Sequence, residues 1–120
     1  MIELPSGSVT LLFTDIEGST RLIEEFGEDG YVLALAKHRR LLRSAFLAHG
    51  GVEVDTQGDA FLYAFADPIG ALAAATLGQQ ALASGQVKVR MGLHTGEVRL
   101  TSEGYAGREL HRAARIASPE

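Results

Sequence analysis

The pattern that most constrains the fold is an apolar run that ends at a carboxylate. Positions 9–14 alternate Val, Leu and Phe with Thr and Leu, which predicts a mostly buried β-strand ending at Asp15. A turn follows, in which Ser19 or Thr20 is expected to cap a short helix that reaches Phe26. A buried strand that feeds a helix in this way favours a layered fold, with helices on a sheet.

A second helix is predicted before the next β-prone run. Gly27 and Gly30 are expected to end the first helix, because glycine is unfavourable inside helices. The second helix covers residues 31–49 and stops at Gly50-Gly51. Its predicted apolar face holds Leu35, Leu42 and Phe46.

Two turn signals organise the middle of the chain. Gly58-Asp59 separates β-prone runs at 52–57 and 60–66 and indicates a hairpin. Asp67-Pro68 is typical of a helix start, with the aspartate as cap and the proline in the first turn. The buried face of that helix is predicted to hold Ile69, Leu72, Ala73, Thr76 and Leu77.

The C-terminal third predicts two more strands and a helix. A turn at Thr95-Gly96 is expected to separate strands at 87–94 and 97–101, and a last helix covers 108–118. The order of elements favours an α/β (α+β) fold with the helices on one face of a sheet. Residues 1–120 are expected to form a single domain, and the natural domain is expected to continue beyond residue 120.

Composition excludes several classes of protein. With 120 residues and 46% apolar content, the chain is long enough for one core. It has no cysteine, so disulfides and thiolate metal sites are excluded. We find no signal peptide and no apolar stretch long enough to span a bilayer. The net charge of −4 argues against general nucleic-acid binding, and the expected location is the cytoplasm.

Two aspartates fall at predicted strand ends. The first strand and the run at 52–57 are expected to be neighbours, which would place Asp15 and Asp59 on one rim of the sheet. Mg²⁺ prefers hard oxygen ligands and binds one or two carboxylates together with substrate phosphates. The Gly18-Ser19-Thr20 turn offers backbone N–H groups at a helix N-terminus, which suits a phosphate. The alternative is that both aspartates are ordinary solvated turn residues.

Four segments, in this order, resemble the class III adenylate/guanylate cyclase catalytic domain of bacterial type. They are LLFTDIEGSTRL, VDTQGDAFLYAFADPIGAL, VRMGLHTGEV and GRELHRAARIAS, and they cover nearly the whole chain. The resemblance implies a ferredoxin-like βαββαβ core and head-to-tail dimers with active sites at the interface. It also implies conversion of a nucleoside triphosphate to the 3′,5′-cyclic monophosphate and pyrophosphate, in intracellular signalling.

The resemblance assigns roles position by position. Asp15 and Asp59 match the aspartates that bind two Mg²⁺ or Mn²⁺ ions, and Ile16 is expected to contribute its backbone carbonyl. Arg115 matches the arginine that stabilises charge on the α-phosphate in the transition state, and it would serve the metal site of the partner subunit. The phosphates are expected on the turn formed by Glu17, Gly18, Ser19 and Thr20.

The chain departs from the family pattern at three positions. The base-reading lysine is replaced by Asp55, the second base-reading position falls at Gly104, and the asparagine four residues before the arginine is His111. A carboxylate at 55 accepts hydrogen bonds, which favours guanine over adenine. The alternative is that Asp55 joins Glu53 on the outward face of a strand. His111 either replaces the asparagine's hydrogen bond to the ribose or is a surface residue.

The other histidines and Tyr31 are interpreted as structural. His94 is expected to be structural, and His38 and His49 have no acidic pair at ligand spacing. Tyr31 is expected in the core or at an interface.

Three alternatives to an active homodimer stay open. DIEGST resembles the DxDGT loop of haloacid-dehalogenase-type phosphatases, but Glu17 and Tyr63 stand where that family needs aspartate. A catalytically degenerate cyclase-homology domain would dimerise or bind a nucleotide as a regulatory module. In a heterodimer, this chain would supply the metal site and another chain would read the base.

Overall fold

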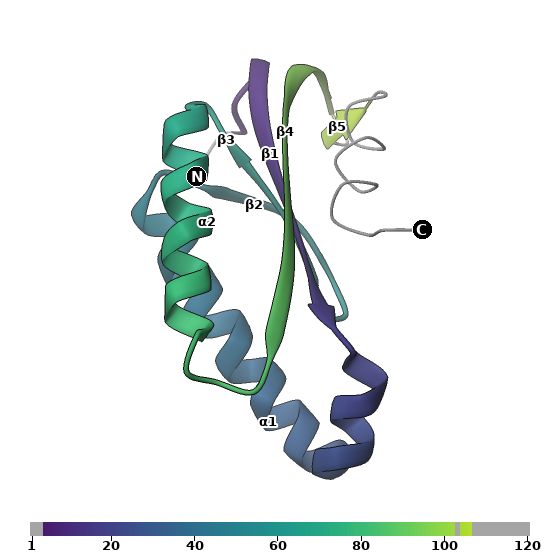
Figure 1. Cartoon of the computed structure of the whole chain (residues 1–120). Coiled ribbons are helices and arrows are strands. Elements are labelled where there is room, and N and C mark those ends of the chain that lie inside the picture. The colour runs from purple at the N-terminus through teal and green to yellow at the C-terminus, as the bar shows by residue number, and fades with distance from the viewer. Residues whose placement is uncertain (1–3, 103, 107–120) are drawn as a thin grey trace.

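Five strands form one antiparallel sheet in the order β2-β3-β1-β4-β5, and both helices cover the same face of it (Figure 1). The computed structural model describes residues 4–102 and 104–106. The elements are β1 (Gly7–Glu17), α1 (Ser19–Ala48), β2 (Val52–Gln57), β3 (Ala60–Phe65), α2 (Pro68–Leu82), β4 (Lys88–Thr101) and β5 (Gly104–Ala106). The predicted layered α+β fold with helices on one face is confirmed.

Strand β1 lies at the centre of the sheet. It pairs with β4 along its whole length, from Gly7 opposite Val98 to Glu17 opposite Lys88. On its other side it pairs with β3, so the expected direct pairing between β1 and the run at 52–57 is wrong. The hairpin places β3 between them, because β3 and β1 both carry apolar residues on two faces.

The predicted turn at Thr95-Gly96 is also wrong. Both residues lie inside β4, opposite Thr10 and Val9, and the hydroxyl oxygens of Thr10 and Thr95 are 2.7 Å apart. The local turn signal is overridden here because β1 pairs with β4 on both sides of these two residues.

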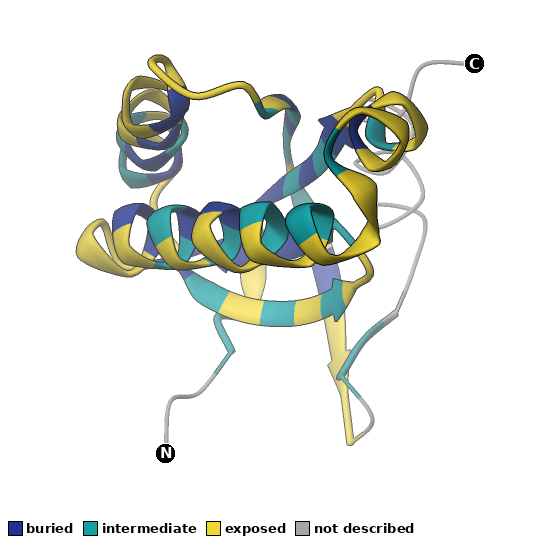
Figure 2. Cartoon of the chain, turned by 90° about the horizontal axis from the view of Figure 1, so that it is seen from below, coloured by how far each residue is buried: buried dark blue, intermediate teal, exposed yellow. Residues whose placement is uncertain are grey.

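Each face of the sheet has its own apolar cluster. On the helix side, strand residues such as Leu12 and Tyr63 pack against Leu42 and Phe46 of α1 and against α2. The opposite face carries Val9, Leu11, Leu62, Ala64 and Val98. Figure 2 shows the buried residues of α1 as one stripe along the helix, with the other side exposed.

Helix α1 confirms one predicted break and corrects two details. Gly27 has non-helical angles (φ 77°, ψ 169°) and kinks the helix, as Figure 1 shows below the sheet. Gly30 lies within the helix and does not end it. The N-cap is Gly18 with φ 67°, and neither Ser19 nor Thr20 caps the helix, because the left-handed turn at glycine replaces a side-chain cap.

Helix α2 begins where the sequence predicts but buries a different face. The Asp67 carboxylate accepts a hydrogen bond from the backbone N–H of Ile69 at 3.0 Å. Ile69 and Leu72 are exposed, and the buried residues are Ala71, Ala74, Gly78 and Leu82. Small residues face inward because the helix packs closely: a Cβ on Gly78 would lie 2.9 Å from Leu42 Cδ2. Because α2 is apolar on several sides, periodicity alone does not select the face.

The remaining expectations concern the ends of the chain. The short strand β5 was not expected from the sequence, and the predicted helix at 108–118 lies outside the described residues. In the described part of the chain, no helix is long and apolar enough to cross a membrane.

Candidate functional site

The end of β1 and the β2–β3 turn meet at one end of the sheet and bring the two predicted aspartates together. Asp15 is half-buried near the end of β1, and Asp59 is half-buried in the turn. Burial raises the pKa of Asp59, and the neighbouring Asp15 carboxylate raises it further. The expectation that the two carboxylates are neighbours is therefore met, although through a different strand pairing, and their role as metal ligands stays a prediction.

Arg90 of β4 completes this cluster and was not anticipated as a site residue. It lies opposite Asp15 in the β1–β4 register, and its Nη2 is 2.7 Å from Asp15 Oδ2. The side chains are about a third and a quarter exposed, 36% for Arg90 and 26% for Asp15, so the pair is open to solvent. This contact follows from the register of two strands that are neighbours in the sheet but distant in sequence, and no local motif predicts it.

Two residues of α1 hold the turn that carries Asp59. The Tyr31 hydroxyl donates to Asp59 Oδ2 at 3.4 Å, and Arg39 donates from Nη2 to the Gly58 carbonyl. Burial and the Asp59 charge raise the pKa of Tyr31. The spacing of eight residues places Tyr31 and Arg39 near one face of the helix, but the sequence does not say which turn that face meets.

The residues present fit a hard divalent cation whose remaining ligands come from a phosphate and from water. Among the described residues there is no group of three or more His, Cys, Asp or Glu side chains that could hold a metal. Two neighbouring carboxylates suit Mg²⁺, which keeps waters and substrate phosphates as its other ligands. Ile16 is 2% exposed and lies opposite Val89 of the helix-side cluster, so only its backbone can contribute a ligand.

The turn between β1 and α1 presents backbone N–H groups without a competing side chain. Gly18 adopts φ +67°, no side chain caps α1, and its first turn has no acidic residue. Glu17 and Thr20 are exposed, and Ser19 is partly exposed. Free N–H groups at the positive end of a helix suit an anion next to the aspartates.

The two positions predicted to read the base lie on opposite edge strands of the sheet, Asp55 on β2 and Gly104 on β5. Asp55 is exposed on β2, and its carboxylate accepts from Thr56 N at 2.9 Å and from Gln57 Nε2 at 3.1 Å. A β-bulge places Glu53 opposite Tyr63 and Asp55 opposite Leu62, residues of opposite sheet faces. The two carboxylates therefore do not share one row of the strand.

Gly104 lies at the far end of β4 from Arg90. It pairs with Thr101, has φ +107°, and its carbonyl accepts a hydrogen bond from the Thr101 hydroxyl at 2.7 Å. One chain therefore does not bring Gly104 to the aspartates. His111 and Arg115 lie outside the described residues.

Comparison with known proteins identifies the relatives of this chain. Residues 2–109 match the family described as "Adenylate and Guanylate cyclase catalytic domain". An uncharacterized protein of Mycobacterium tuberculosis is 40% identical over 114 residues, which cover 93% of this chain and 39% of the relative. An adenylate cyclase of Lachancea kluyveri is 31% identical over 144 residues, covering 94% of this chain and 8% of that protein. The chain thus spans about two fifths of one curated relative and less than a tenth of the other.

Solved structures show the same fold. An adenylate cyclase from Trypanosoma brucei in its monomeric state superposes with a TM-score of 0.83 at 29% identity, covering 98% of this chain and 71% of that one. An adenylate/guanylate cyclase/hydrolase from Silicibacter pomeroyi gives a TM-score of 0.77 at 26% identity, covering 94% and 70%. On the strength of the family match across most of its length, the chain belongs to the adenylate and guanylate cyclase catalytic domain family.

Proposed function

We propose that this chain is a nucleotide cyclase that converts a nucleoside triphosphate to its 3′,5′-cyclic monophosphate and pyrophosphate. The observation that carries the proposal is the meeting of Asp15 and Asp59 at one end of the sheet, beside Arg90. Family membership supports the reaction class, and the paired carboxylates supply the chemistry that it needs.

Asp15, Asp59 and the Ile16 carbonyl would hold the divalent cations. Two Mg²⁺ or Mn²⁺ ions bound there would make the ribose 3′-hydroxyl easier to deprotonate and would offset the charge of the triphosphate. Tyr31 and Arg39 keep the Gly58-Asp59 turn in place, so that the carboxylate keeps its position.

The triphosphate would lie between the Glu17–Thr20 turn and Arg90. The turn offers uncapped N–H groups, and Arg90 places a guanidinium next to Asp15. The N–H groups and the guanidinium would both donate hydrogen bonds to the phosphate oxygens, next to the bound cations.

We propose a head-to-tail dimer in which each nucleotide is bound by both subunits. Gly104 lies too far along β4 from Arg90 to contact a nucleotide that is bound at Asp15 of the same chain. A second chain would therefore bring Asp55 and Gly104 to the base, and His111 and Arg115 to the ribose and α-phosphate. The second chain is either a copy of this one or another cyclase domain.

Guanine is the base that Asp55 fits best. Each of its two oxygens accepts one hydrogen bond within the chain and keeps further lone pairs, so the carboxylate can accept from guanine N1–H and its exocyclic amine. Adenine offers no matching donor pair.

A turnover assay tests the proposal. The purified protein is incubated with Mn²⁺ and either ATP or GTP, and cyclic nucleotides are measured by mass spectrometry. Asp59→Asn is expected to lower turnover at least 100-fold, because a metal ligand is lost. Asp29→Asn, which changes an exposed acidic residue of α1, is the matched control and is expected to leave activity unchanged.

Two outcomes would contradict the proposal. Wild-type activity in a folded Asp59→Asn variant would remove the aspartates from the mechanism. No product from the folded wild-type protein with either nucleotide would instead favour the degenerate regulatory module.

A further inference from the structure

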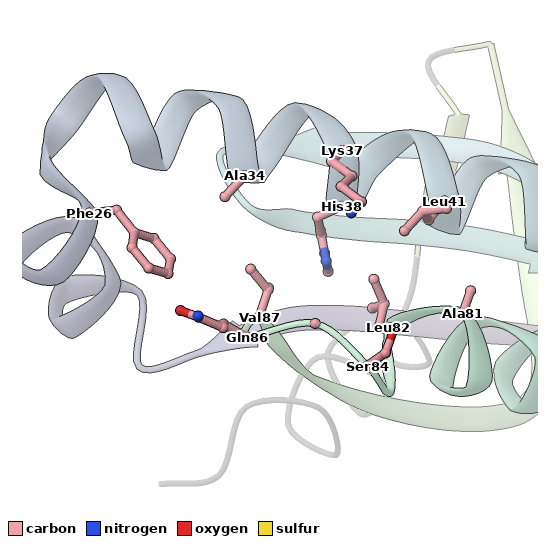
Figure 3. A pocket seen from close by; sticks show the side chains of 11 residues that line it. Phe26, Ala34, Lys37, His38, Leu41, Ala81, Leu82, Ser84, Gln86 and Val87 are labelled. Carbon is pink, nitrogen blue, oxygen red and sulfur yellow. The ribbon is translucent and has the colours of Figure 1, made fainter.

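A pocket of about 310 Å³ lies between the two helices (Figure 3). It is lined by the inner face of α1, by the end of α2 and by the loop that leads from α2 to β4. This volume is near the lower end of the range for small-molecule sites, about 300–1,000 Å³. The pocket is therefore large enough for a small ligand.

His38 is the polar group at the centre of the pocket. Its side chain is 1% exposed, and in Figure 3 the ring points away from α1 toward the end of α2 and the start of β4. Neither Nδ1 nor Nε2 has a hydrogen-bond partner among the described residues. Leaving a buried polar group without a partner costs about 1–3 kcal/mol, so a partner from outside the chain would be favourable.

The charges around His38 favour an anion. Lys37 is the charged side chain in the pocket lining within the described part of the chain, and no acidic residue lines it. Burial and, to a smaller extent, the nearby Arg39 charge together lower the pKa of His38 to about 4. The neutral ring has one N–H donor and one acceptor nitrogen, in a region where nearby charges are positive.

The rest of the lining is mainly apolar and leaves room for a hydrocarbon body. Phe26 comes from the segment before the Gly27 kink, Ala34 and Leu41 from the long part of α1, and Leu82 and Val87 from the opposite wall. Ser84 and Gln86 add hydroxyl and amide groups at the loop. An apolar wall with a few polar groups is typical of sites for amphipathic small molecules.

We propose that this pocket binds a small monocarboxylic acid, with its carboxylate on the His38 ring and Lys37 and its apolar body between the helices. The His38 N–H donates to a carboxylate oxygen, and the Lys37 ammonium supplies the opposite charge. The second ring nitrogen is then available to a water molecule that enters with the ligand.

This site is separate from the proposed nucleotide site. None of its lining residues is one of the aspartates or belongs to the Glu17–Thr20 turn. Binding can therefore be measured without nucleotide and without divalent cations, so a failure of the cyclase proposal would leave this one standing. The two sites share only α1, which also carries Tyr31 and Arg39.

Hexanoate and benzoate, each compared with its alcohol, test the proposal. Calorimetry and amide NMR titrations are done in buffer with EDTA, using hexan-1-ol and benzyl alcohol as uncharged probes. The acids are expected to bind at least 10-fold more tightly than the alcohols, with the largest shifts near His38 and Gln86. His38→Leu and Lys37→Met are each expected to weaken hexanoate binding at least 10-fold.

Matched variants separate this site from others on the protein. His49→Leu changes an exposed histidine at the end of the same helix and is expected to bind hexanoate as the wild type does. Ala34→Phe is expected to fill the pocket and abolish binding. No binding of either acid to the wild type, equal binding of acids and alcohols, or unchanged binding in a folded Ala34→Phe variant would each overturn the proposal.

Discussion

Glu53 joins α1 to the β2–β3 hairpin through its carboxylate. Arg43 donates to both oxygens, at 2.9 and 3.3 Å, and the Tyr63 hydroxyl donates at 2.8 Å. Arg43 also lies 5.1 Å from the centre of the Phe61 ring. The Arg43 hydrogen bonds are the main cause that lowers the pKa of Glu53 to about 2. The ionised carboxylate is therefore part of the folded structure.

Glu53→Gln should destabilise the protein at neutral pH but not in strong acid. The pKa of Glu53 is lower in the folded protein than in the unfolded chain, where it is near 4.5. The stabilisation from the ionised carboxylate is therefore complete above pH 4.5 and is lost as the pH falls toward 2. We expect the difference in free energy of unfolding between wild type and variant to be constant above pH 5 and to shrink between pH 4.5 and 2. Urea titrations across this range measure it, and a difference independent of pH would contradict the role of the charge.

His38 predicts a second pH dependence, in a different window. Its folded pKa of about 4 lies below the ordinary 6.5, so the unfolded chain takes up a proton first. Stability is complete above pH 6.5 and falls by on the order of 3 kcal/mol as the pH drops to 4. His38→Leu should remove this loss and also raise stability at pH 7. Thermal unfolding of both proteins from pH 7.5 to 4 checks it; parallel curves would show that His38 does not titrate as described.

Arg90 is expected to act on nucleotide binding. Arg90→Met removes the guanidinium next to Asp15 and should raise KM for the nucleoside triphosphate about 10- to 100-fold, the usual range for a lost charged hydrogen bond. Arg90→Lys keeps the charge and should lose less. Steady-state kinetics at saturating Mn²⁺ measure both. A fall in kcat with unchanged KM would assign Arg90 a role in the transition state instead.

At the scale of elements, the junction of α1 and β2 depends on Gly51. Its N–H donates to the Phe46 carbonyl at 2.9 Å, and an added Cβ would lie 2.7 Å from Phe65 Cζ and 2.9 Å from the Phe46 carbonyl oxygen. Backbone and a packed ring cannot easily move away. Any side chain at position 51 therefore forces its neighbours to shift.

Gly51→Ala should destabilise the protein by about 1–3 kcal/mol, the usual cost of forcing extra volume into a packed core. Gly85→Ala is the matched control, because its nearest neighbour would be an ordinary contact at 3.5 Å. Chemical denaturation gives the free energy of unfolding for each. Equal stability of the two variants would contradict the clash at residue 51.

The elements show what local patterns can predict. Alternation and turn residues gave β1, the β2–β3 hairpin and the start of α2, because these features are encoded within a few neighbouring residues. The inward face of α2 and the continuous β4 were missed. Both depend on the partner: Gly78 is buried because Leu42 approaches it, and Thr95 stays in a strand because Thr10 lies opposite.

In the candidate site, too, the residues in local motifs were predicted, and those brought in by long-range contacts were not. Asp15 and Asp59 were predicted from motifs at strand ends, and burial together with the neighbouring Asp15 carboxylate raises the pKa of Asp59. Arg90, Tyr31 and Arg39 were not predicted as site residues, since their contacts join segments far apart in the chain. The roles of Asp55 and Gly104 remain predictions.

At the scale of the whole molecule, a head-to-tail dimer in which both subunits bind each nucleotide should recover activity when two inactive variants are mixed. Asp59→Asn removes the proposed metal site, and Arg115→Ala removes the proposed transition-state charge. In a head-to-tail dimer, mixing the two inactive variants leaves one intact site in each mixed dimer. Activity should return to about a quarter of the wild-type value, since half of the dimers are mixed and half of their sites are intact. Mixing after brief denaturation and assaying turnover tests this; no recovery in mixed dimers would place both groups in one subunit's site.

The central position of β1 has a consequence for how this protein is made. Strand β1 carries apolar residues on both faces and is synthesised before both of its partners, because β3 ends at residue 65 and β4 at residue 101. Each edge of β1 is open to pairing with other chains until its own partner strand has been made. The sheet is thus assembled through contacts distant in sequence, a class of contact that forms slowly and leaves strand edges exposed to aggregation in the meantime.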